Sequence, residues 1–166
     1  MLCVACATHV RASKPKRAPL APTQARSAGA FETVRADEAA VGELLALYYD
    51  DFAAGDWSGF RTRFWDDATI VTVRRTAEGG LGEVATAIDA FVVGALKRSR
   101  PLEITVDATE FALDGAAPSV VVRYRAQDRS GDAPQRWRGR DEFALRRIDG
   151  EWRIASVFVG RELSAQ

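Results

Sequence analysis

The chain has 166 residues, 47% of them hydrophobic and 28% charged, values typical of one soluble globular domain with room for an appendage. The formal net charge is zero, but residues 1–30 contain no acid and five basic residues, so residues 31–166 carry an excess of five acids; the basic residues are Arg11, Lys14, Lys16, Arg17 and Arg26. A mildly acidic body excludes nucleic acid as the main partner, because phosphate binding needs a basic face.

The residue types present also exclude several classes of chemistry. From residue 10 onward the chain contains neither histidine nor cysteine. This excludes a Ser-His-Asp triad, a cysteine nucleophile and a histidine base in the domain. Cys3, Cys6 and His9 lie together near the start, but a four-ligand zinc site would need a carboxylate that the first 31 residues lack. We therefore expect no metal site and no cofactor.

Residues 1–36 are predicted to form a disordered, basic tail rich in proline and alanine. Residues 12–30 have no apolar periodicity and cannot bury enough surface to offset the entropy of ordering. Residues 2–10 are apolar, but no positive charge precedes them and they are too few to cross a bilayer. We expect a cytoplasmic protein without membrane contact, with one domain over residues 37–162 and a short tail over 163–166.

Helical spacing dominates the first part of the domain. An apolar stripe predicts a helix that begins after Asp37 as N-cap and ends at Gly55; its members are Val41, Leu44, Leu45, Tyr48 and Phe52. Asp56 is expected to cap a second, shorter helix. Asp66 and Asp67 then predict a turn into a strand over residues 69–73. A third helix is predicted from the stripe of Val84, Ile88, Phe91, Val92 and Ala95.

From residue 101 onward the period changes to two, which predicts strands up to residue 159 separated by Gly-containing turns. The apolar parity switches between residues 107 and 110, which indicates a β-bulge. Early helices and late strands predict an α+β fold: three N-terminal helices packed on a curved, mainly antiparallel sheet, as a cone-shaped, barrel-like domain. A pocket is expected between the two layers.

Strand alternation places Asp141 on the apolar face of its strand, between Trp137 and Phe143. A carboxylate there must be paired, with Arg123 or Arg125 as candidates, or protonated, which would make it a hydrogen-bond donor. Tyr48 lies in the apolar helical stripe, so its hydroxyl also points inward, either as a functional group or as part of the core. Thr72 shares a strand face with Arg74. The residues expected to line the pocket are Phe52, Trp57, Thr72, Arg74, Tyr124, Trp137 and Phe158.

Two segments carry a resemblance to a known superfamily. The run YYDDFAAGDWSGFRTRFWDDATIV (48–71) resembles the opening of the nuclear transport factor 2-like superfamily, and GRDEFALRRIDGEWRIASV (139–157) is similar to its last two strands. Within this superfamily, the chain is similar to SnoaL-like and ketosteroid-isomerase-like domains. The resemblance implies the fold more strongly than any single activity.

The resemblance implies roles for three residues. In ketosteroid isomerases a tyrosine eight residues before the aspartate of "GD" donates to the substrate oxyanion, and that position is Tyr48. A protonated aspartate on the penultimate strand is the second donor, and it falls on Asp141. The general base of that family falls on Thr72, which cannot abstract a carbon-bound proton near neutral pH. SnoaL-type cyclases resemble this fold but use a histidine, which the domain lacks.

Three functions follow as hypotheses. The first is isomerase- or cyclase-like chemistry on a small, largely apolar molecule, with Tyr48 and Asp141 as catalytic oxyanion donors. The second is binding of a small-molecule ligand without catalysis. The third is association of the chain as a homodimer through the outer face of the sheet.

Overall fold

The computed structural model describes residues 24–75, 80–97, 102–129 and 134–163, without the side chains of residues 24–31, 74, 75, 162 and 163. Three helices and six strands follow one another in the order α1 (Gln24–Ala54), α2 (Trp57–Thr62), β1 (Phe64–Arg75), β2 (Leu81–Ala87), α3 (Ile88–Leu96), β3 (Leu102–Ala112), β4 (Ser119–Asp128), β5 (Gln135–Ile148) and β6 (Glu151–Leu163). No helix within the described ranges is both long enough and apolar enough to cross a membrane.

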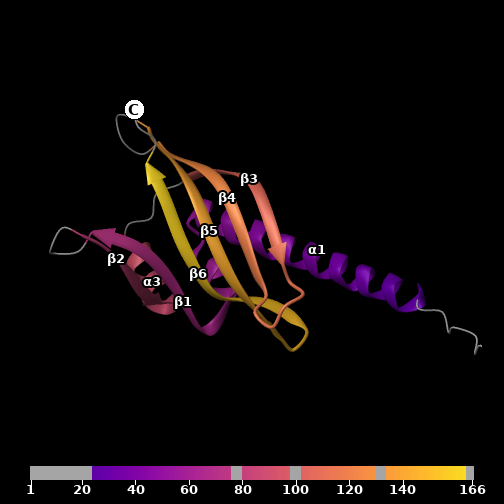
Figure 1. The fold of residues 1–166 in the computed structure, drawn as a ribbon. Helices are drawn as coiled ribbons and strands as arrows, with labels where there is room; N and C mark the ends of the chain where they lie inside the picture. The colour runs from indigo at the N-terminus through magenta and orange to yellow at the C-terminus, as the bar shows by residue number, and fades with distance from the viewer. Residues whose placement is uncertain (1–23, 76–79, 98–101, 130–133, 164–166) are drawn as a thin grey trace, which may run out of the picture.

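The six strands form one curved sheet in the order β2-β1-β6-β5-β4-β3. Strands β3 to β6 form an antiparallel meander, β1 joins its β6 edge in parallel, and β2 pairs antiparallel with β1. Figure 1 shows α1 lying across the back of the sheet, with its N-terminal half projecting beyond it. The predicted α+β fold of three helices on a curved, mainly antiparallel sheet is confirmed.

The turn from α1 into α2 follows from two residues, Gly55 and Asp56. Gly55 takes φ 71°, a left-handed conformation that costs glycine little. Its N–H donates to Phe52 O (3.3 Å), and Asp56 N–H donates to Asp51 O (2.9 Å), which is the Schellman motif. The Asp56 carboxylate then accepts from Gly59 N–H at 3.0 Å. Both predictions for this turn are confirmed.

The start of α1 differs from the prediction. The helix begins at Gln24, so residues 24–36 are helical where a disordered tail was expected, and Asp37 is an interior helical residue instead of an N-cap. Its carboxylate accepts from Trp152 Nε1 (3.3 Å) and forms an ion pair with Arg147 Nη1 (3.1 Å). Asp37 therefore ties α1 to the β5–β6 hairpin. Residues 1–23, with Cys3, Cys6 and His9, and residues 164–166 lie outside the described residues.

The segment between α2 and α3 also differs from the prediction. Strand β1 begins at Phe64, so Asp66 and Asp67 lie inside it, at an irregularity in its pairing with β6 between Phe64 and Thr69. Residues 81–87 form β2, and the third helix begins only at Ile88. Val84 therefore pairs across β1 with Thr72 instead of belonging to the helix. A short β-branched and apolar run fits a strand and a helix equally well until its partner is known.

Alternation along β5 separates the core from the outer face of the sheet. The buried set is the predicted one: Trp137, Gly139, Asp141, Phe143 and Leu145. The residues between them are exposed. In β3 the register shifts between Val106 and Ala108, which confirms the predicted bulge. Helix α1 packs on the inner face, against β3 and β6, and α3 packs against β1. The inner face and α1 thus enclose the core.

Candidate functional site

A cavity of about 130 Å³ lies between α1, α3 and the inner face of the sheet. Its wall is mainly apolar and aromatic, with one carboxyl, three phenol hydroxyls, one threonine hydroxyl, an indole and a guanidinium; the residues are Tyr48, Tyr49, Phe52, Ile70, Thr72, Phe91, Leu102, Ile104, Tyr124, Ala126, Trp137, Asp141, Val159 and Arg161. A dry cavity of about 150 Å³ can hold benzene, so this volume suits a single six-membered ring.

Asp141 is the polar centre of the cavity. Its side chain is almost fully buried, with 2% of the residue exposed. Tyr49 Oη donates a hydrogen bond to Asp141 Oδ2 at 3.0 Å, while Oδ1 is buried without a hydrogen-bond partner among the described residues. Burial raises the pKa of Asp141 from 3.8 to about 7, and the hydroxyls of Tyr49 and Tyr124 and the charge of Arg161 oppose that rise. Neither Arg123 nor Arg125 pairs with it; they bind Glu110 and Asp107.

Tyr124 reaches the site because β5 has a glycine opposite it. Tyr124 and Gly139 are direct partners across β4 and β5, and a Cβ at Gly139 would overlap the Tyr124 ring at Cζ and its hydroxyl. The ring therefore fills the space over Gly139, with its hydroxyl near Trp137 and Asp141. Burial raises the pKa of the Tyr124 phenol, and the neighbouring Asp141 charge adds to this effect. The indole Nε1 of Trp137 is buried and, like Asp141 Oδ1, lacks a hydrogen-bond partner within the described ranges.

Tyr48 lines the same cavity from within an aromatic cluster. Its ring centroid lies 4.9 Å from that of Tyr49, 5.0 Å from Phe60 and 5.1 Å from Phe143. Burial, with a smaller contribution from the Asp141 charge, raises the pKa of its phenol well above the ordinary value. The Tyr48 hydroxyl therefore stays protonated at any physiological pH and can only donate or accept hydrogen bonds.

The structure brings together six of the nine residues singled out from the sequence: Tyr48, Phe52, Thr72, Tyr124, Trp137 and Asp141 all line the cavity. Trp57 instead packs behind it, edge-on to Phe52. Phe158 was expected in the pocket, but strand alternation puts it on the outer face of β6, in a separate groove. The side chain of Arg74 lies outside the described residues.

Tyr49 and Arg161 also line the cavity, and neither was expected there from the sequence. Tyr49 follows Val41 and Leu45 at spacings of four, so a wider helical stripe would have included it. Arg161 lies beyond residue 159, where the last strand was expected to end. Strand β6 in fact continues to Leu163, and Arg161 pairs with Gly139 on the inner face.

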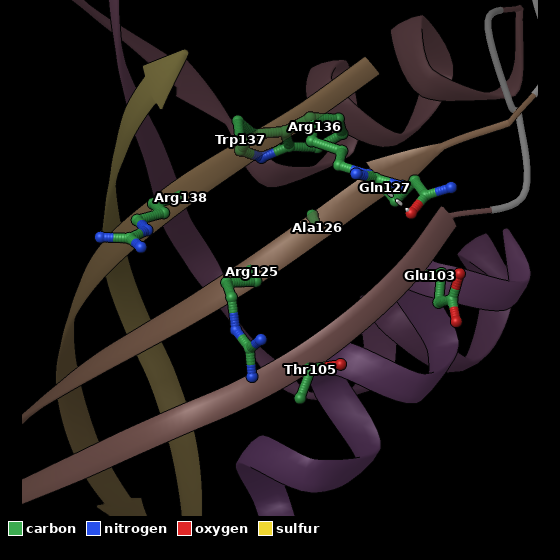
Figure 2. A pocket seen from close by; sticks show the side chains of 8 residues that line it. All are labelled: Glu103, Thr105, Arg125, Ala126, Gln127, Arg136, Trp137 and Arg138. Atoms are coloured by element: carbon green, nitrogen blue, oxygen red, sulfur yellow. Dashed lines mark hydrogen bonds between the residues drawn. The ribbon is translucent and has the colours of Figure 1, made fainter. Parts of the chain in front are cut away.

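Four arginines lie together on the outer face of the sheet, and we call this surface the arginine face: Arg123, Arg125, Arg138 and Arg140. Arg123 lies directly across from Arg140, and Arg125 from Arg138. Figure 2 shows Arg125 and Arg138 beside one groove of about 380 Å³, where Arg136 Nε also donates to Gln127 Oε1 at 3.2 Å. A second groove, of about 870 Å³, contains Val73 and Phe158 among the arginines.

The family model that matches the chain and the solved structures that resemble it agree with one another. A model of the SnoaL-like domain matches residues 33–157. No curated protein matches the chain.

Solved structures share the fold at low sequence identity. A nuclear transport factor 2-like protein of unknown function from Shewanella baltica is 20% identical, with a TM-score of 0.56 over 77% of this chain and 95% of that one. A second such protein, from Pseudomonas putida, is 12% identical, with a TM-score of 0.62 over 80% and 91%. A proposed scytalone dehydratase from Novosphingobium aromaticivorans is 11% identical, with a TM-score of 0.66 over 80% and 89%. The chain belongs to the SnoaL-like domain family, and it shares its fold with nuclear transport factor 2-like proteins.

Proposed function

We propose that the inner cavity binds a ring-sized, largely apolar carbonyl or enol compound, whose oxygen accepts a hydrogen bond from the protonated carboxyl of Asp141. One observation carries this proposal: Asp141 Oδ1 is buried in the cavity wall and has no hydrogen-bond partner among the described residues. An unsatisfied buried polar atom costs about 1–3 kcal/mol, which a bound oxygen would remove. The pKa of about 7 means that the acid form is well populated at neutral pH.

The same donors would support chemistry as well as binding. An oxygen that gains negative charge, as a carbonyl does on enolisation, is stabilised by donors fixed in a water-poor site. Asp141 and Tyr48 supply such donors, and the indole N–H of Trp137 lies in the same wall, beside the Tyr124 hydroxyl. Isomerase- or cyclase-like turnover on these residues is the catalytic form of the proposal.

The threonine at position 72 favours a second form of the proposed function, in which the cavity binds its ligand without turnover. It lines the cavity from β1, where the resemblance to ketosteroid isomerases implies a general base. A threonine hydroxyl cannot remove a carbon-bound proton near neutral pH. Proton exchange next to the carbonyl of a bound cyclic ketone, followed by NMR in D2O, separates the two forms: exchange that depends on Asp141 supports turnover, and its absence supports binding alone.

The binding proposal is tested with phenol and toluene, which have the same size and differ in one hydroxyl. At pH 6 the wild type should bind phenol about tenfold more tightly than toluene, the gain of one buried hydrogen bond. Asp141→Leu should abolish that preference, and Asp141→Asn, which keeps the shape and a donor, should retain it at every pH. Equal binding of the two probes by the wild type, or binding of neither at millimolar concentration, would contradict the proposal.

We also infer that the chain associates as a homodimer through the arginine face. Arg123, Arg125 and Arg140 are paired with carboxylates of the same chain, but Arg138 has no ion pair among the described residues. Val73, 43% exposed, lies with Phe158 and Arg138 in the groove on this face. A second copy would cover this apolar surface and supply a carboxylate to Arg138. Light scattering should give a dimer for the wild type and a monomer for Phe158→Asp; a wild-type monomer at high concentration would overturn the inference.

A further inference from the structure

Arg161 stands at the rim of the cavity, stacked on an aromatic ring. Its guanidinium carbon lies 4.2 Å from the centre of the Trp137 ring, and its side chain lines the cavity that Asp141 occupies. Arg161 is exposed while Trp137 and Asp141 are buried, so the guanidinium marks the solvent side of the cavity wall. The guanidinium thus lies over the indole ring, a contact that uses none of its N–H groups as conventional hydrogen-bond donors and leaves them available to a ligand.

The charge of Arg161 is uncompensated within the described part of the chain. Three of the four residues of the arginine face have carboxylate partners: Arg123 has Glu110, Arg125 has Asp107 and Arg140 has Glu142. Arg161 forms no ion pair with any described carboxylate. Asp141 is the acid that it influences: the Arg161 charge lowers the pKa of that carboxyl, but burial still keeps this pKa at about 7, so most of Asp141 is uncharged at pH 6.

We propose that Arg161 recognises a carboxylate on the ligand, so that the cavity takes a ring-sized carbonyl or phenolic compound with a carboxylate at the end opposite the oxygen bound by Asp141. This inference rests on the proposed function of the same cavity. Two parallel N–H groups of a guanidinium match the two oxygens of a carboxylate, and such charge-assisted bonds are about twice as strong as neutral ones. The ring itself would lie between these two polar ends, against the aromatic wall.

The alternative is that Arg161 only covers Trp137 and is otherwise solvated. An exposed cation–π contact is weakly favourable without any ligand. The two roles of Arg161 predict different effects of the ligand's charge on its affinity. A covering role predicts the same affinity for charged and neutral ligands, whereas recognition predicts a preference that disappears with the guanidinium.

The test uses 4-hydroxybenzoate and 4-hydroxybenzamide, which share ring, hydroxyl and shape and differ in charge. Titration calorimetry at pH 6 and low salt keeps most of Asp141 protonated and the benzoate ionised. The wild type should bind the benzoate about tenfold more tightly than the benzamide, and salt should shrink that ratio. Arg161→Met should reduce the ratio to about one and leave the benzamide affinity unchanged. Arg161→Lys should keep part of the preference.

Arg138→Met is the matched control, because Arg138 is an exposed arginine of β5 on the outer face without an ion pair among the described residues. It should leave both affinities unchanged. Equal wild-type affinities for the two probes, or a preference that survives Arg161→Met, would overturn the inference while the binding function stands. Failure of both probes to bind would overturn the inference and the proposed function together.

Discussion

Tyr49 and Asp141, 92 positions apart in the chain, are joined by a 3.0 Å hydrogen bond from the Tyr49 hydroxyl to Asp141 Oδ2. The bond crosses the core from α1 to β5 and fixes which carboxyl oxygen faces the cavity. Because Tyr49 occupies Oδ2, the proton of the neutral acid belongs on Oδ1, the oxygen without a partner in the described structure. Tyr48, the residue that the superfamily resemblance selects, contributes its ring to the aromatic cluster beside this pair.

Replacing Tyr49 by phenylalanine should raise the pKa of Asp141 further, by about one pH unit, because the hydroxyl stabilises the ionised carboxylate. Tyr48→Phe is the matched control, since it removes a neighbouring buried hydroxyl from the same helix. It should leave that pKa nearly unchanged. Carboxyl 13C NMR across a pH titration measures both, and equal effects of the two substitutions would contradict the assignment of Tyr49 as the partner.

Asp141 should make the protein less stable as the pH rises. Its pKa is about 7 in the folded chain and near 3.8 when unfolded, so the folded state binds the proton more tightly. The resulting stability is complete below pH 3.8 and is lost as the pH rises through about 7, a change on the order of 4 kcal/mol.

Asp141→Asn removes this dependence, because an amide does not ionise. Urea unfolding at pH 5 and pH 8 should show the wild type losing stability relative to the variant at the higher pH. Parallel stability profiles for the two proteins would mean that Asp141 is ionised in the fold at both pH values.

Substitution of Gly139 should damage the site more than the fold around it. A Cβ at this position overlaps the Tyr124 ring, so Gly139→Ala must displace Tyr124 from between Trp137 and Asp141. We expect a stability loss of about 1–3 kcal/mol from overpacking and loss of phenol binding. Gly42→Ala is the control: apart from its chain neighbours and the backbone of its own helix, nothing lies within 4 Å of its Cβ position in α1, and the change should stabilise the helix by about 0.5–1 kcal/mol. Unchanged phenol binding by Gly139→Ala would show that Tyr124 does not contribute to the binding site.

Asp37 should contribute to the attachment of α1 to the sheet. Asp37→Ala removes its bonds to Trp152 and Arg147 and should cost about 1–2 kcal/mol, measured by chemical unfolding. Glu43→Ala, an equal change of charge at an exposed position of α1, should stay within about 0.5 kcal/mol of the wild type. Similar losses in both variants would point to helix charge instead of the link to the hairpin.

Local rules in the sequence determined much of the fold. Gly55 and Asp56 specify their turn through backbone conformation and capping, which depend only on neighbouring residues. Period-two alternation determined which side of β5 faces the core, and with it the burial of Asp141. The start of α1 and the identity of β2 were missed because both depend on contacts distant in sequence: Asp37 binds the β5–β6 hairpin, and residues 81–87 become a strand by pairing with β1.

The composition of the site was decided by the tertiary structure. Alternation places Asp141 inside, but whether an arginine or a tyrosine meets it depends on how α1 lies across the sheet, and that packing selects Tyr49. The gap at Gly139 that admits Tyr124, and the extension of β6 that brings Arg161 over Trp137, are relations between strands. The sequence alone therefore determined that a buried acid exists. The packing of α1, β4 and β6 around it decided its hydrogen-bond partners, its protonation state and which of its oxygens faces the cavity. Each of these depends on distances between residues far apart in the chain, which local sequence rules do not specify.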